Sequence, residues 1–170
     1  TRGEFAYVGC SYSGLAVVNI TNAGQPVLAG ILPKRGEHRD VDLLGPYVVF
    51  PGQGELDIVD VTDPREPQSI AHQSLPDITH GVTVVGDRIY IGYYQGIDEA
   101  RFQVMDASVP TAPRVISSFK TSGLPLDLVA DDGNAYVTYW QKRQPGSAYL
   151  GVLDLSDPAE PKEIGALDAV

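Results

Sequence analysis

Short runs of apolar residues, mostly leucines and β-branched residues, recur along the chain and are separated by polar turns. One such run covers residues 56–61 and leads into an acidic, proline-containing turn at 62–67. Apolar runs of this length and composition predict strands that are buried on both faces. No stretch of a dozen residues has the 3.6-residue apolar period of a helix. The pattern therefore predicts an all-β chain.

This strand-and-turn pattern occurs four times with a constant spacing. In each copy an Asn or Asp ends the apolar run, and a proline follows seven residues later. The side-chain oxygen of that Asn or Asp can accept a hydrogen bond from the backbone N–H two residues on, which ends the strand. The proline lacks an N–H and fixes φ, so the chain turns before the next strand begins. The four pairs are Asn19 and Pro26, Asp60 and Pro67, Asp106 and Pro113, and Asp154 and Pro161.

A second pattern precedes the acidic turn in copies two to four. An alternating strand, a hairpin turn containing Gly and a second apolar strand occupy residues 41–50, 82–91 and 126–137. With the strand after the proline, each copy has four short strands. Successive capping residues are separated by 41, 46 and 48 residues, which is the period of a β-propeller built from four-stranded blades. The predicted blades, here called repeats one to four, span residues 4–36, 37–77, 78–122 and 123–170.

The second copy also carries a family resemblance. The sequence LDIVDVTDP at residues 56–64, preceded by a hairpin similar to V-x-V-x-G-x-x-Y-V (VDLLGPYVV at residues 41–49), resembles the LVIVD repeats of bacterial and archaeal surface proteins. The resemblance extends over nearly the whole chain, although Asn19 replaces the Asp in the first copy and Val109 precedes the proline in the third. It implies a β-propeller that is extracellular, on the cell surface or periplasmic, and it brings no catalytic residues with it.

Repeat one differs from the others at its beginning. Residues 5–8 match the second strand of a blade, and no strand after Val170 supplies the first one. A closed propeller leaves no free sheet edge. We therefore expect the four repeats to be part of a longer propeller, and the alternative is a three-stranded first blade.

Composition excludes several classes of partner. The net charge is −10 and the pI is near 4.5, whereas nucleic-acid binding requires a basic surface. No apolar run approaches 18 residues, so we expect no membrane insertion. The acidic surface is expected to keep a β-rich protein soluble.

The connections between the second and third strands lengthen from residues 51–54 to 92–100 and 139–147. In a propeller these loops emerge on the same face as the blade-joining segments 34–38, 76–80 and 121–125. Loops on a rigid scaffold carry function, and exposed aromatic rings beside polar groups suit a protein or carbohydrate partner. The alternative is that the rings only pack over the ends of the blades. The predicted binding residues are Tyr93, Tyr94, Tyr139, Trp140, Arg143, Arg39 and His80.

The sequence thus predicts a non-catalytic binding, adhesion or scaffold module without a cofactor or bound metal. One alternative is a propeller hydrolase, lyase or metal-dependent oxidoreductase, with its site at the channel mouth near Arg39, Asp40, His80 and Asp127. Another is a structural subunit whose free blades pair with neighbouring chains or with further blades.

A metal site would have to be assembled from several repeats. His38 and His80 occupy similar places before the first strands of repeats two and three, and both are expected to line the channel mouth. A third ligand would be a carboxylate, from Asp40, Asp77 or Asp127. The recurring Asp-x-x-Asp at 60/63 and 154/157 lacks the dense oxygen spacing of a calcium loop, and turn capping explains it more simply.

Overall fold

The chain has an all-β fold, as the sequence predicts. The computed structural model describes residues 1–95, 99–121, 123–131, 133–140 and 148–169. Within these ranges the one helical element is the 3-10 turn η1 (Ser11–Ser13), and no helix is long and apolar enough to cross a bilayer. The strands are β1 (Phe5–Cys10), β2 (Gly14–Asn19), β3 (Val27–Leu32), β4 (Asp42–Leu44), β5 (Tyr47–Asp60), β6 (Gln68–Val85), β7 (Arg88–Gln95), β8 (Glu99–Asp106), β9 (Arg114–Lys120), β10 (Leu124–Ala130), β11 (Asn134–Trp140), β12 (Ala148–Asp154) and β13 (Lys162–Ala169).

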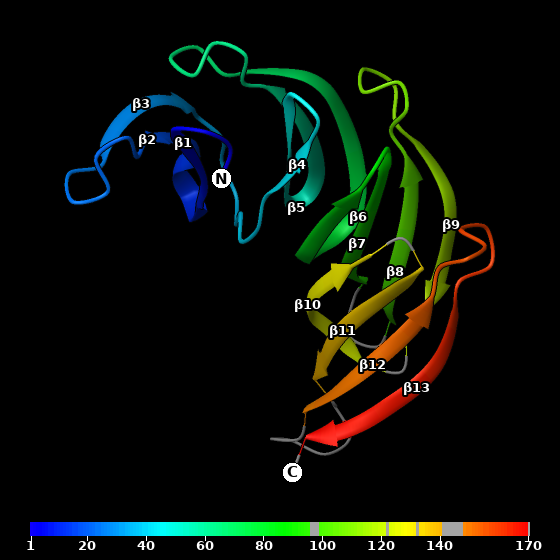
Figure 1. The fold of residues 1–170 in the computed structure, drawn as a ribbon. Coiled ribbons are helices and arrows are strands. Elements are labelled where there is room, and N and C mark those ends of the chain that lie inside the picture. Colours follow the sequence, from blue (N-terminus) through cyan, green and yellow to red (C-terminus); the bar gives the residue numbers. More distant parts are fainter. Residues whose placement is uncertain (96–98, 122, 132, 141–147, 170) are drawn as a thin grey trace.

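The strands form antiparallel sheets that follow one another along an arc, and the two chain ends lie at opposite ends of it (Figure 1). Strands β1–β3 form the first sheet, β4–β9 a six-stranded sheet, and β10–β13 the last. The six-stranded sheet contains two predicted repeats, because residues 68–78 of β6 pair with β5 and residues 79–85 pair with β7. The arrangement is that of propeller blades, and the number of blades stays a prediction.

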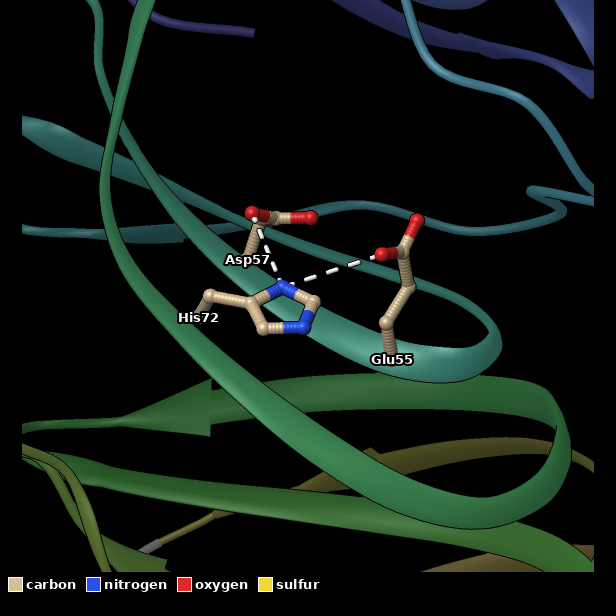
Figure 2. A group of neighbouring side chains, drawn as sticks. All are labelled: Glu55, Asp57 and His72. Atoms are coloured by element: carbon tan, nitrogen blue, oxygen red, sulfur yellow. Dashed lines mark ion pairs between the residues drawn. The ribbon is translucent and has the colours of Figure 1, made fainter.

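The prediction that residues 51–54 form a turn between two separate strands is wrong, because they belong to one continuous strand. Strand β5 continues through them from Tyr47 to Asp60. The chain bends at Gly54, whose φ of +77° is unfavourable for residues with a Cβ. The pairing of β5 with β6 shifts register between Gln53 and Glu55. Figure 2 shows the ribbon turning back on itself beside Glu55.

The predicted turn caps are present in all four repeats. Each capping oxygen accepts a hydrogen bond from the backbone N–H two residues on, so these oxygens stabilise turns. The same bonds favour the charged carboxylate and hold the pKa of Asp106 and Asp154 below the ordinary value. The donors and acceptors are Thr21 to Asn19, Thr62 to Asp60, Ser108 to Asp106 and Ser156 to Asp154, with N···Oδ1 distances of 2.8–2.9 Å.

A β-bulge and a small residue recur in the last strand of each repeat, here called the outer strand: β3, residues 68–78 of β6, β9 and β13. The small residue at Gly30 allows close approach to the next repeat, because an added Cβ would lie 2.4 Å from the carbonyl oxygen of Pro64. At the same place in repeat three, Ser117 Oγ donates a 2.7 Å hydrogen bond to the carbonyl oxygen of Pro158. Each outer strand can therefore dock on the acidic turn of the next repeat. The small residues, four positions after the closing prolines, are Gly30, Ala71, Ser117 and Gly165.

The apolar core lies between the sheets of consecutive repeats. At the first junction, Leu15 and Val17 of β2 belong to one cluster with Val59 and Val61 of repeat two. We call the sheet face that packs on the following repeat the forward face, and the face that packs on the preceding repeat the backward face. The equivalent residues pack at the other junctions: Leu56 and Ile58 with Met105 and Ala107, and Phe102 and Val104 with Leu153 and Leu155.

Candidate functional site

Two of the aromatic residues predicted to lie in exposed loops are buried. Tyr93 is 3% exposed and its hydroxyl lies 3.2 Å from Ser118 Oγ. Tyr139 is fully buried and its ring stacks on Tyr149, with the centroids 4.8 Å apart. Burial raises the pKa of the Tyr139 hydroxyl. The expectation of exposed rings is wrong here because the strand ladders extend further than the sequence suggested, pairing Tyr93 with Arg101 and Tyr139 with Tyr149.

The other predicted aromatic residues also lie in strands. Tyr94 is half-buried in β7 and pairs with Ala100 of β8. Trp140 is 38% exposed at the end of β11, where it pairs with Ala148. Its indole therefore belongs to the last sheet rather than to a loop. Arg143 lies outside the described residues.

Arg39 and His80 lie next to each other, with Glu37 beside Arg39. Arg39 makes an ion pair with Glu37, at 2.7 Å, and a second nitrogen lies 3.5 Å from His80 Nδ1. The hydrogen bond from Arg39 lowers the pKa of Glu37. Burial and the nearby guanidinium lower the pKa of His80. The structure thus brings these two predicted binding residues together, and a partner for them stays a prediction.

Asp40, which the enzyme alternative placed at the channel mouth, joins two repeats. Its carboxylate accepts hydrogen bonds from the backbone N–H groups of Val41 and Val82, at 2.8 and 2.9 Å. Burial raises the pKa of Asp40 despite these bonds. Asp42 makes an equivalent bond to the N–H of Val84, at 2.7 Å. Both carboxylates therefore tie the start of repeat two, at β4 and the residues just before it, to residues 79–85 of β6 in repeat three.

His38 and His80 have different surroundings. His38 is 2% exposed and stacks on the Phe50 ring, with a centroid separation of 4.2 Å. An added Cβ at Gly52 would lie 2.3 Å from its Cε1 atom. His38 is therefore packed within repeat two, and the expectation that it lines an open channel mouth is wrong.

A compact polar cluster lies beside the bend in β5, and we call it the repeat-two cluster: Lys34, Glu55, Asp57 and His72. His72 Nδ1 is 3.5 Å from Asp57 Oδ1 and 3.7 Å from Glu55 Oε2 (Figure 2). Lys34 Nζ lies 2.9 Å from Asp57 Oδ2 and 3.9 Å from Glu55 Oε2. One donor atom from each of the residues Glu55, Asp57 and His72 lies within 4.8 Å of the others. Such a set of groups can hold a cation or a charged ligand.

Sequence reasoning missed this cluster because Asp57 stands inside the repeated strand motif. Its side chain is fully buried. Comparison of the four copies gives the signal that identifies it, since this position is otherwise uncharged. The equivalent residues, three before each cap, are Ala16, Gln103 and Gly151.

A groove of about 400 Å³ lies between repeats three and four, among the acidic turns. Its lining includes Asp87, Arg88 and Asp106. Asp106 already accepts the backbone N–H of Ser108. The groove thus follows from the turn structure that every repeat shares.

Comparison with protein-family models supports the interpretation of the repeats. The LVIVD repeat model matches residues 1–32, 35–71 and 127–169. These regions correspond to repeats one, two and four and together cover more than half of the chain. A search of the curated proteins finds no match. The chain belongs to the LVIVD repeat family.

Proposed function

We propose that this chain is a non-catalytic scaffold module that binds a second copy of itself, sheet face against sheet face. The carrying observation is that the forward face of repeat four has the apolar composition of a junction face, and no described residue packs on it. The forward faces of repeats one to three each pack on the next repeat. No catalytic group is needed for this function.

The forward face of repeat four has the apolar character of a junction. Leu167 is 69% exposed and Ile164 is 61% exposed. Ile164 is the bulged residue of β13, and its counterpart in repeat three, Ile116, is packed against the core at the third junction. Nothing lies within 4 Å of a Cβ added at Gly165, whereas a Cβ added at Gly30 would lie 2.4 Å from the carbonyl oxygen of Pro64 in the next repeat. This face is built as the other forward faces are, and among the described residues no repeat packs on it.

The indole of Trp140 adds to the same face. The side chains of β11 alternate between buried and exposed positions, and Tyr139 points toward repeat three. Tyr136 and Trp140 therefore lie on the other side of the sheet, with exposures of 39% and 38%. Tyrosine and tryptophan are enriched among the residues that dominate interface energies. Trp140 thus remains a proposed binding residue, but on a sheet face instead of in a loop.

The backward face of repeat one offers the complementary surface. Val8 and Ile31 flank Ala16 in adjacent strands and are 42% and 43% exposed. The residues that match Val8 at the second and third junctions, Ile91 and Val137, are fully buried. At each internal junction a forward face meets a backward face, so the forward face of one copy fits the backward face of another. Such a head-to-tail contact gives a ring if the rotation closes.

Sedimentation equilibrium of three proteins tests the proposal. The wild-type chain is expected to associate with increasing concentration, starting from a monomer of 18.2 kDa. Val8→Glu damages only the backward face, and Leu167→Glu damages only the forward face. Each variant alone is expected to stay monomeric, because a buried unpaired carboxylate is unfavourable. An equimolar mixture is expected to form a heterodimer through the one intact pair of faces.

The control is Val115→Glu, which adds the same charge at a 49% exposed position of β9 in repeat three. It is expected to associate as the wild type does. A wild type that remains monomeric at all concentrations, or association that is unchanged in Val8→Glu and Leu167→Glu, overturns the proposal.

The family resemblance supports a second, independent statement about location. We propose that the module acts at the cell surface or in the envelope. Fractionation of source cells followed by immunodetection tests this, and recovery of the protein only from the cytosol contradicts it.

A further inference from the structure

The repeat-two cluster contains a charge that the fold does not require. Asp57 is fully buried, and burial of a carboxylate is unfavourable unless it is paired. The same strand position is occupied by Ala16, Gln103 and Gly151 in the other repeats. A residue without a charge therefore satisfies the sheet at this point. The reason for a buried charge at Asp57 must therefore lie in the residues around it.

These neighbours hold Asp57 in one orientation. Ser69 Oγ donates a 2.6 Å hydrogen bond to Asp57 Oδ1, and the Lys34 ammonium forms an ion pair with Oδ2. Oδ1 is also the oxygen that lies 3.5 Å from His72 Nδ1. Ser69 and Lys34 thus hold the carboxylate in place, while Oδ1 also faces His72, a more exposed member of the cluster. Ligand carboxylates in metal sites are supported by such outer contacts.

His38 supplies an independent sign that a ligand belongs here. Its Nδ1 lies 3.1 Å from the carbonyl oxygen of Pro51. A carbonyl oxygen only accepts, so Nδ1 must carry the hydrogen, and Nε2 of the neutral ring then has a lone pair. Nε2 is buried without a hydrogen-bond partner and faces Glu55 Oε1 at 4.0 Å. A metal-binding imidazole is oriented in this way, with its other nitrogen donating to a carbonyl.

We propose that Glu55, Asp57 and His72 bind a divalent transition cation such as Zn²⁺, with His38 Nε2 directed at Glu55 from the buried side. An imidazole with two carboxylates is a ligand set that Zn²⁺ accepts. Metal–ligand bonds of about 2.0–2.2 Å place neighbouring ligand atoms of a tetrahedral site roughly 3.3–3.6 Å apart. The distances from His72 Nδ1, 3.5 and 3.7 Å, are close to that separation.

Lys34 sets the strength of the site. With neutral histidines, the two carboxylates and one ammonium give the cluster a net charge of −1. The ammonium is directed mainly at Oδ2 of Asp57, at 2.9 Å, whereas Glu55 is 3.9 Å away. Oδ1 of Asp57 and the Glu55 carboxylate remain available to a cation. Binding is therefore expected to be weaker than it would be without the lysine.

Calorimetric titration of the purified chain with Zn²⁺ tests the proposal. The wild type is expected to bind one Zn²⁺. His72→Ala removes a surface ligand that is 53% exposed and is expected to lower the affinity at least about tenfold. Glu55→Gln is expected to do the same. The matched control is His80→Ala, which removes a histidine that lies beside Arg39 outside the cluster.

Thermal unfolding gives a second readout. A ligand that binds only the folded state raises its stability, so Zn²⁺ is expected to raise the Tm of the wild type and of His80→Ala but not that of His72→Ala. Absence of Zn²⁺ binding overturns the proposal, and so does an affinity that is unchanged in both His72→Ala and Glu55→Gln. Binding of Ca²⁺ in preference to Zn²⁺ overturns the assignment to a transition cation. Because the end faces are not involved, Leu167→Glu is expected to bind Zn²⁺ normally.

Discussion

Substitution of Gly30 by Ala gives a direct measure of how tightly consecutive repeats pack. The added methyl would lie 2.4 Å from Pro64 O and 2.8 Å from the carbonyl oxygen of Arg65. The shorter distance is roughly 1 Å less than a comfortable van der Waals separation. Both neighbours are backbone atoms, so a side-chain rotation cannot relieve the clash. The outer strand of repeat one must move away from repeat two.

Gly165→Ala is the matched control, because Gly165 occupies the equivalent position in repeat four. Nothing lies within 4 Å of its added Cβ, and neither glycine has a positive φ. Overpacking costs about 1–3 kcal/mol, whereas a compatible Gly→Ala change stabilises by about 0.4–1 kcal/mol. The free energy of unfolding is therefore expected to fall in Gly30→Ala and to rise slightly in Gly165→Ala. The two variants should differ by roughly 1.5–4 kcal/mol.

Urea unfolding followed by far-UV circular dichroism and by fluorescence of the single tryptophan measures this difference. Trp140 reports on the last sheet and Gly30 lies in the first. In Gly30→Ala the dichroism transition is expected to begin at lower urea than the fluorescence transition, because repeats unfold partly independently. The comparison is made at low protein concentration, where Gly165 stays uncovered. Equal shifts in both variants would refute the packing argument.

Three further measurements test other contacts. Ser117→Ala removes the hydroxyl that donates to Pro158 O and is expected to lower the free energy of unfolding by about 0.5–1.5 kcal/mol in urea titrations. Lys34→Met leaves the buried Asp57 carboxylate without its ammonium, so the free energy of unfolding should fall by about 3 kcal/mol. The double variant Lys34→Met/Asp57→Ala should recover most of that loss. An unchanged urea midpoint in Lys34→Met would contradict the ion pair. Asp106 has a lowered pKa, so its contribution to stability is present above the ordinary value of 3.8 and is lost as the pH falls through the lower folded value. Asp106→Asn keeps the acceptor and removes the charge, and the stability difference from wild type should shrink as acid is added in that window; a pH-independent difference in unfolding midpoint would contradict it.

The turns could be predicted from sequence because their physics is local. An Asn or Asp at the end of a strand and the N–H two residues later are neighbours in the chain, whatever the rest of the protein does. The bond from Thr62 N to Asp60 Oδ1 therefore follows from the sequence alone. The all-β fold follows in the same way from the short apolar runs.

The position of the aromatic side chains could not be predicted, because it depends on how far two strands remain paired. A shift of the strand pairing by one residue moves every side chain of the strand to the opposite sheet face. Tyr139 thus points into the core toward repeat three, while its neighbour Trp140 points away from it. Composition of the segment is the same in either case, so only the register decides between a binding loop and a core.

The repeat-two cluster was missed for a related reason, and it shows where function is to be sought in such a chain. Positions that serve packing or capping recur in every copy, and their residues are explained by the repeat. A position that departs from the other copies requires a separate explanation, particularly when it introduces a buried charge. Asp57 makes such a departure, and Lys34 and Ser69 compensate it locally. An ion pair alone would stabilise the fold no better than Ala, Gln or Gly does elsewhere. With the carboxylate of Glu55 and the imidazole of His72, Asp57 completes a set of metal ligands. The cation site is therefore inferred here and not at the acidic turns that all repeats share.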